Sequence, residues 1–178
     1  MSSIYIIRHC STTGQEPEAR LTEAGKQQAL ALAAFLTNLG IERIVSSPFQ
    51  RAVQSIEPFA AQTGLALETD GRLRERVLSP VPLENWQELL RRSFDDPDFT
   101  VPGGESSCEA ANRAEAAFRE VVEAGKVTAL VTHGNLTALL LGRLGLPFGA
   151  DEQARLTNPD VYCVEATHSG HRIQRLWI

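Results

Sequence analysis

The apolar residues of this chain fall into short continuous runs separated by longer stretches of helical spacing. Continuous β-branched and aliphatic runs predict buried strands at 4–7, 44–45 and 127–131. Another short strand is predicted at 65–68. A terminal strand pair is predicted at 161–167 and 172–178, joined by a polar turn at Gly170.

Helices are predicted between these strands. Thr22 is placed to cap the first, whose apolar run ends before Gly40. Pro48 suits the first turn of a second helix that ends at Gly64. Further helices are predicted at 84–94, 105–125 and 135–144, the last amphipathic, with irregular connections at 73–82 and 95–104.

Strands that alternate with helices of this length predict an α/β fold, with a mainly parallel sheet and helices on both faces. The length of 178 residues predicts a single domain, 1–178. In such sheets, ligands bind beyond the carboxyl ends of the strands. Polar residues that follow the predicted strands are therefore candidate site residues.

Cations and imidazoles follow three of these strands. Arg8 and His9 leave the first strand, Arg51 comes soon after the second, and His133 follows the strand at 127–131. If the strands are neighbours, their exits form a pocket suited to phosphate, because a guanidinium binds phosphate oxygens bidentately. One imidazole could then attack phosphorus while the arginines stabilise the developing charge.

Two further requirements follow from that chemistry. The attacking nitrogen must be unprotonated, so the other ring nitrogen needs an oxygen acceptor, which the sequence does not identify. Glu75 is the best-placed carboxylate for proton exchange, and together these groups predict a bell-shaped pH profile. Taken singly, Arg8-His9 also fits a solvated strand end, and Glu75 lies in a charged run, 72–76, of the kind common on surfaces.

Charge and cysteine content exclude several functional classes. A net charge of -5 argues against nucleic-acid partners. Three cysteines without CxxC spacing indicate a reduced, intracellular protein. The N-terminus lacks export-signal features, and the longest apolar runs, such as 136–141, are too short to span a bilayer. We therefore expect a cytoplasmic protein that does not bind membranes.

The remaining histidines and aromatic residues give weaker signals. His168 and His171 flank the predicted hairpin turn without enough further ligand-type residues, so no metal site is predicted. Trp86, Phe94 and Phe99 fit either the wall of a substrate pocket or ordinary packing.

Six segments taken together resemble the histidine phosphatase superfamily, the phosphoglycerate-mutase-like enzymes, and are closest to its small bacterial phosphatases. They are Arg8-His9 with Thr12 (RHGxT), 21–29 (LTxxGxxQA), 46–54 (SSPxxRAxQT, with Ser55 in the last place), 73–75 (LxE), 103–106 (GGES) and 131–134 (distal HG).

This resemblance implies a three-layer α/β/α fold and a mechanism without metal or cofactor. It implies three catalytic residues, with His9 as the phosphorylated nucleophile, Glu75 as the proton donor and His133 in the phosphate pocket. The implied substrate-binding residues are Arg8, Arg51, Thr12 and Gln15, the last where the family often has Asn. Substrate specificity is expected to lie in an insert at about 77–104.

Cys10 departs from the family pattern, since it stands where the family has Gly. Nearby arginines are expected to favour its thiolate and make it open to oxidation, although packing is the commoner fate of a cysteine.

The leading function is hydrolysis of a small phosphorylated metabolite. The alternatives are a phosphoglycerate-mutase-type phosphotransferase, a phosphohistidine protein phosphatase, and a non-catalytic protein that binds a phosphorylated ligand. The sequence does not predict the natural substrate or the oligomeric state.

Overall fold

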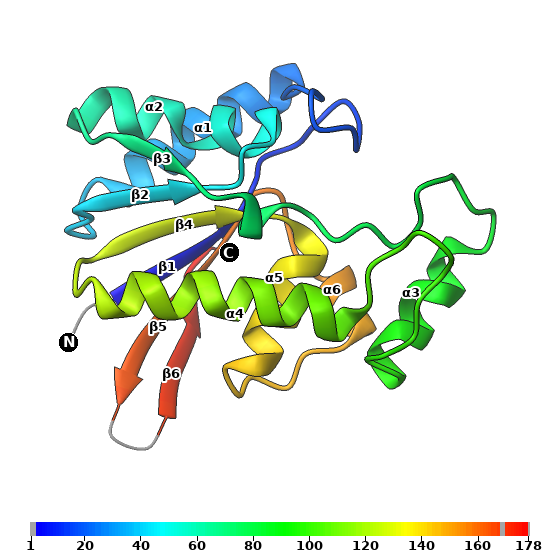
Figure 1. The fold of residues 1–178 in the computed structure, drawn as a ribbon. Helices are drawn as coiled ribbons and strands as arrows, with labels where there is room; N and C mark the ends of the chain where they lie inside the picture. The colour runs from blue at the N-terminus through cyan, green and yellow to red at the C-terminus, as the bar shows by residue number, and fades with distance from the viewer. Residues whose placement is uncertain (1–2, 168–169, 178) are drawn as a thin grey trace.

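A computed structural model describes residues 3–167 and 170–177 of the chain (Figure 1). The described residues form one six-stranded sheet of order β3-β2-β4-β1-β5-β6. β1 to β4 pair in parallel, whereas β5 and β6 are antiparallel additions beside β1. The strands are β1 (Ser3–Arg8), β2 (Arg43–Ser46), β3 (Leu67–Thr69), β4 (Thr128–Thr132), β5 (Asp160–Thr167) and β6 (Gly170–Arg175).

Helices cover both faces of the sheet. Figure 1 shows α1 and α2 on one face and α4 and α5 on the other. The helices are α1 (Glu23–Leu36), α2 (Gln50–Thr63), α3 (Trp86–Asp95), α4 (Ser107–Glu123), α5 (Gly134–Arg143) and α6 (Ala150–Ala154), with a 3-10 turn η1 (Gly71–Leu73). The predicted three-layer α/β/α fold with a mostly parallel sheet is confirmed.

The two apolar cores follow from the alternation of side chains along the strands. In β1, Ile4 and Ile6 pack with α4 and α5, whereas Tyr5 and Ile7 pack with α1 and α2. A strand side chain points to the opposite face at each step, so a strand between two helical layers must be apolar at every position. This explains why the strands appear in the sequence as continuous apolar runs.

Several local predictions differ from the structure. α1 ends at Leu36, before Gly40, and α2 begins at Gln50, so Pro48 lies in the preceding turn rather than in the helix. The stretch predicted as amphipathic forms α5, which is buried at every residue from 134 to 141, because it is covered on all sides. Gly170, predicted as the turn, is the first residue of β6 and pairs with Thr167 of β5. His168 lies outside the described residues.

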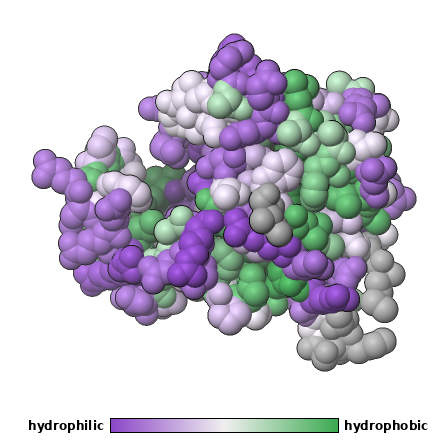
Figure 2. Space-filling model, turned by 180° about the vertical axis from the view of Figure 1, so that it is seen from behind, coloured by the Kyte–Doolittle hydropathy of each residue, from purple (hydrophilic) through white to green (hydrophobic). Residues whose placement is uncertain are grey.

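The segment at 77–104 contains α3 and projects from the body of the molecule (Figure 1). Figure 2 shows this lobe as largely hydrophilic, with a hollow between it and the body. Phe94 packs on the apolar core and Phe99 lies under the guanidinium of Arg92, whereas Trp86 is half exposed. Two of the three aromatic residues therefore serve packing. No helix in the described parts of the chain is long and apolar enough to cross a membrane.

Candidate active site

The carboxyl ends of β1, β4 and β2 lie side by side, because these strands are consecutive in the sheet. Two backbone hydrogen bonds continue the pairing past the strand ends, from His9 N to Thr132 O at 3.0 Å and from Ser47 N to Val131 O at 2.9 Å. The sheet order thus provides the neighbouring exits that a shared pocket requires. Arg8, His9 and His133 leave from adjacent strands.

His9 is 95% buried, and its ring is held in one tautomer. Its Nδ1 lies 2.7 Å from the carbonyl oxygen of Cys10. A carbonyl can only accept, so Nδ1 carries the hydrogen and Nε2 keeps its lone pair. Burial lowers the pKa of His9 to about 3; the bond to Cys10 opposes this shift, and the charges of Arg51 and Arg8 add to it. Asn158 fixes the backbone by donating to His9 O at 2.8 Å.

Arg8 reaches the site at the end of β1. Its Nη1 donates to Leu156 O at 2.8 Å, and its buried Nε has no partner in the described part of the chain. A Cβ at Gly134 would lie 3.2 Å from three atoms of this guanidinium. The glycine of the HG motif thus gives Arg8 room to lie over the start of α5.

Arg51 is held in the first turn of α2 and is only 1% exposed. Its Nη1 donates to the carbonyl oxygens of Gln15 and Glu16 at 3.0 and 2.9 Å, and its Nε has no partner in the described residues. Burial lowers the pKa of Arg51, as it does for Arg8, and in both cases the charge of Glu75 opposes the shift. A buried guanidinium with an unused donor is suited to binding an anion.

His133 is fully buried at the N-cap of α5. Its ring centroid lies 5.1 Å from that of His9 and 5.2 Å from that of Phe49. Its Nε2 lies 2.8 Å from Ser47 Oγ, and its Nδ1 has no partner among the described residues. Burial lowers the pKa of His133 well below the ordinary range, and the neighbouring His9 and Arg51 lower it further. Two neutral imidazoles therefore lie close to two arginines.

Glu75 binds the first turn of α5. Its Oε1 accepts from the backbone N–H groups of Arg76 and Leu136 at 2.9 and 3.0 Å, and its Oε2 accepts from that of Asn135 at 3.0 Å. Such bonds satisfy donors that a helix start leaves free. The carboxylate thus has a structural role at the start of α5, the helix that His133 caps.

Thr12 and Gln15 lie in the loop after β1, and within the described residues their side chains do not bind the other candidate residues. Thr12 Oγ1 donates to Gly14 O and Arg20 O, both at 3.1 Å. The side chain of Gln15 is exposed, and it is its backbone carbonyl that orients Arg51. Substrate binding by either side chain stays a prediction.

Cys10 is completely buried among the apolar side chains of α1 and α2. Its backbone N–H donates to Ser55 Oγ at 2.8 Å. Burial raises the pKa of the Cys10 thiol to about 11, with the hydroxyl of Ser55 opposing the shift. The expectation of a favoured, oxidisable thiolate is therefore wrong, because burial disfavours the charged thiolate. Packing is the role that the structure supports.

Several positioning residues escaped the sequence reasoning. Ser47 and Ser55 lie in the 46–54 motif and directly after it. The sequence does not show that Ser47 contacts His133 or that Ser55 accepts from the backbone N–H of Cys10. Gln28, in the 21–29 motif, accepts from Ser11 N at 2.8 Å and so holds the loop after His9. Asn158 gave no sequence signal, since it meets His9 from the other end of the chain. No group of three or more residues of the types His, Cys, Asp and Glu is placed to hold a metal within 3–167 and 170–177.

The two buried histidines predict how stability depends on pH. Both have lowered pKa values, so between about pH 6.5 and 3 an unfolded chain takes up a proton at His9 that the folded chain does not. Stability is then lost as the pH falls through this range. Between pH 7.5 and 5, we expect the free energy of unfolding to fall by about 2 kcal/mol more in the wild type than in His9→Gln.

Urea unfolding at the two pH values measures this difference. His171→Gln provides the control, because His171 is exposed on β6, and its loss of stability should equal that of the wild type. An identical pH dependence in His9→Gln and the wild type would contradict the burial of a neutral His9.

Comparison with known proteins places the fold and the motifs in one family. Residues 4–178 match the family described as "Histidine phosphatase superfamily (branch 1)". A curated relative from Yersinia pestis, named probable phosphoglycerate mutase, is 33% identical and covers 89% of this chain and 82% of its own.

Two solved structures share the fold. A mycobacterial glucosyl-3-phosphoglycerate phosphatase superposes with a TM-score of 0.80 at 26% identity, over 99% of this chain and 97% of its own. A phosphoserine phosphatase variant from Entamoeba histolytica superposes with a TM-score of 0.81 over 98% of this chain and 95% of its own. At 18% identity, that second likeness shows the fold alone.

Proposed function

Since the chain belongs to the histidine phosphatase superfamily, we propose that it hydrolyses a small phosphomonoester through a phosphohistidine on His9. The observation that carries this proposal is the state of the His9 ring. Its Nδ1 is committed to the Cys10 carbonyl, so Nε2 offers a lone pair beside two arginines with unused donors. A neutral imidazole positioned in this way is an activated nucleophile.

The surrounding charges favour a phosphoryl group. Arg51 supplies a buried guanidinium and Arg8 a partly buried one. α2 and α5 begin close to each other, since the rings of their N-cap residues Phe49 and His133 lie 5.2 Å apart, so the positive ends of both helices add to the attraction. His133 Nδ1 has no partner in the described residues and is available to a phosphate oxygen. We infer that these groups stabilise the charge that develops on the equatorial oxygens as His9 attacks.

Glu75 is the proposed proton donor to the leaving oxygen. Among the described residues, Oε2 accepts one hydrogen bond, from Asn135 N, whereas Oε1 accepts two, so Oε2 has a position free for a proton. As the ester P–O bond breaks and the bond from His9 Nε2 to phosphorus forms, this proton moves to the alcohol and leaves a carboxylate. That carboxylate then takes a proton from the water that hydrolyses the phosphohistidine.

The first test is release of p-nitrophenol from p-nitrophenyl phosphate with EDTA present, because the proposed mechanism uses no metal. Turnover is expected, and orthovanadate, an analogue of the transition state, should inhibit it. Absence of turnover with vanadate still raising the melting temperature would favour a non-catalytic phospholigand-binding protein.

Glu75→Gln should lower kcat/KM for an alkyl phosphate such as phosphoserine by roughly 10²- to 10⁴-fold. The value for p-nitrophenyl phosphate should change much less, because nitrophenolate leaves without needing a proton. The ratio kcat/KM reports the steps up to the phosphohistidine, in which the leaving group departs. Glu57→Gln, an exposed carboxylate of α2, is the matched control. If kcat/KM fell equally for both substrates, Glu75 would not be the proton donor.

A phosphoglycerate-mutase-type transfer is the second candidate, favoured by the name of the Yersinia relative. In that case the protein, primed with 2,3-bisphosphoglycerate, should interconvert 2- and 3-phosphoglycerate faster than it releases phosphate. Quantifying both products in one reaction separates a mutase from a hydrolase.

A further inference from the structure

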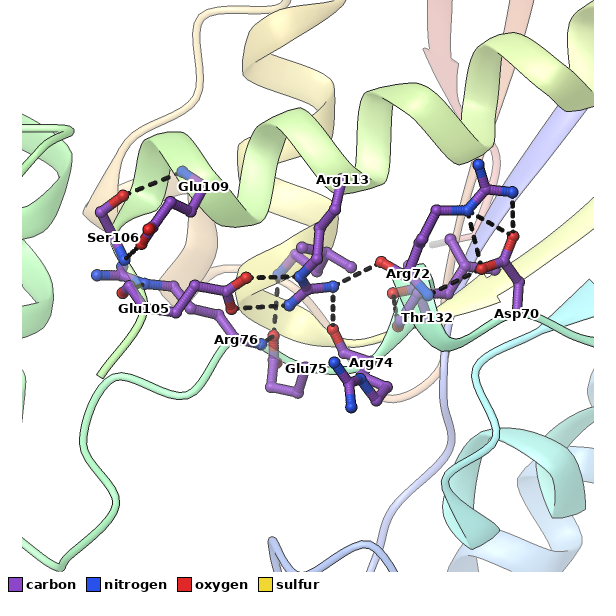
Figure 3. A network of polar contacts seen from close by, with 12 residues as sticks. Asp70, Arg72, Arg74, Glu75, Arg76, Glu105, Ser106, Glu109, Arg113 and Thr132 are labelled. Carbon is purple, nitrogen blue, oxygen red and sulfur yellow. Dashed lines mark hydrogen bonds and ion pairs between the residues drawn. The ribbon is translucent and has the colours of Figure 1, made fainter. Parts of the chain in front are cut away.

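An ion pair outside the proposed site, between Glu105 and Arg113, binds the backbone on which Glu75 stands (Figure 3). Arg113 Nε and Nη2 bind the two carboxylate oxygens of Glu105 at 2.6 and 2.9 Å. The side chain of Arg113 is 17% exposed and that of Glu105 is 23% exposed, so this bidentate pair is largely protected from solvent. Such geometry is better defined than that of a single contact between surface charges.

The third nitrogen of Arg113 holds the chain just before Glu75. Nη1 donates to the carbonyl oxygens of Arg72 and Arg74 at 2.5 and 2.8 Å. The carbonyl between them, that of Leu73, accepts from Thr132 Oγ1 of β4 at 2.8 Å. All three carbonyls that precede Glu75 are therefore bound, two of them by one guanidinium (Figure 3).

Glu105 holds the chain just after Glu75 through its own backbone. Its N–H donates to Val77 O at 2.7 Å, and its carbonyl oxygen accepts from Arg76 Nε at 2.9 Å. Gly104 permits this approach, because a Cβ there would lie 2.2 Å from Leu78 O. The ion pair thus contacts the chain on both sides of Glu75, while the Glu75 carboxylate is fixed separately by α5.

We propose that Glu105 and Arg113 form a positioning pair that places Glu75 for proton transfer to the leaving oxygen. This inference rests on the phosphatase function proposed above. It assigns a task to Glu105 of the 103–106 motif, which the proposed chemistry does not use directly. Because proton transfer needs hydrogen-bond distance between donor and acceptor, a small displacement of the 72–77 backbone should impair this step and leave the His9 nucleophile intact.

The test compares two leaving groups in variants of the pair. Arg113→Gln removes the charge and cannot bind Glu105 and two carbonyls together. We expect its kcat/KM for phosphoserine to fall by about 10²-fold, and that for p-nitrophenyl phosphate by less than about 3-fold. Glu105→Gln, which keeps the backbone contacts, should show the same selectivity with a smaller loss. Arg113→Lys, which keeps one charge, should recover part of the phosphoserine activity.

Arg119→Gln is the matched control, because Arg119 lies on the same helix in an exposed pair with Glu115. This variant should leave kcat/KM unchanged for both substrates. Equal losses on both substrates in Arg113→Gln, or no loss on either, would overturn the positioning role. A selective loss in Glu75→Gln without one in Arg113→Gln would overturn it and leave the phosphatase function standing. Absence of phosphoester hydrolysis by the wild type would overturn both.

Discussion

Replacing His9 with alanine should lower kcat/KM for p-nitrophenyl phosphate by about 10⁴-fold or more, because the variant lacks the atom to which phosphorus is transferred. The loss should be the same for poor and good leaving groups, unlike that of Glu75→Gln. Arg8, Arg51 and His133 are still present in this variant, so phosphate should still raise its melting temperature. We therefore expect His9→Ala to lose catalysis and to keep phosphate binding.

Trapping of the intermediate measures the same step directly. Acid-labile, base-stable phosphate should appear on the denatured wild type after brief exposure to substrate and should be absent from His9→Ala. His171→Ala, an exposed histidine on β6, is the control and should be labelled like the wild type. Labelling of His9→Ala would place the phosphohistidine on another residue, and His133 would be the first candidate.

Replacing Arg51 with methionine should lower kcat/KM by about 10³-fold without a comparable loss of stability. The guanidinium is desolvated, as its lowered pKa reflects, and its Nε has no partner in the described residues. A buried charge of this kind costs free energy that an apolar side chain of similar length does not. In phosphate-free buffer we expect the free energy of unfolding to stay within about 1 kcal/mol of the wild type, or to rise.

Thermal melts with and without phosphate test whether Arg51 serves phosphate binding rather than stability. Phosphate should stabilise the wild type and Arg172→Met, an exposed arginine of β6, but should have little effect on Arg51→Met. If the free energy of unfolding of Arg51→Met in phosphate-free buffer fell by more than about 3 kcal/mol, the hydrogen bonds to Gln15 and Glu16 would make Arg51 mainly structural.

The layered fold was predictable because its signals are local in the sequence. Ile4 to Ile7 is apolar at every position, as a strand between two helical layers must be. Thr22 marks a helix start because its hydroxyl accepts from Gly25 N, and Gly64 marks a helix end because it adopts a left-handed backbone conformation. The boundaries near Pro48 and the complete burial of α5 were less predictable, since neighbouring elements determine them. Helical spacing predicts that a segment is a helix but does not reveal how many of its sides are covered.

The candidate residues could be named from the sequence, whereas their chemical states could not. The sequence by itself determined that Arg8, His9, Arg51 and His133 follow predicted strands, whereas the order of those strands in the sheet came from the structure. Only the tertiary structure decided that His9 Nδ1 binds the Cys10 carbonyl, that the Cys10 thiol is buried, and that Arg113 holds the backbone before Glu75. Strand and helix patterns arise between residues a few positions apart. Tautomer, desolvation and the partners of a charge depend on atoms that packing brings together, as it does for Asn158 and His9.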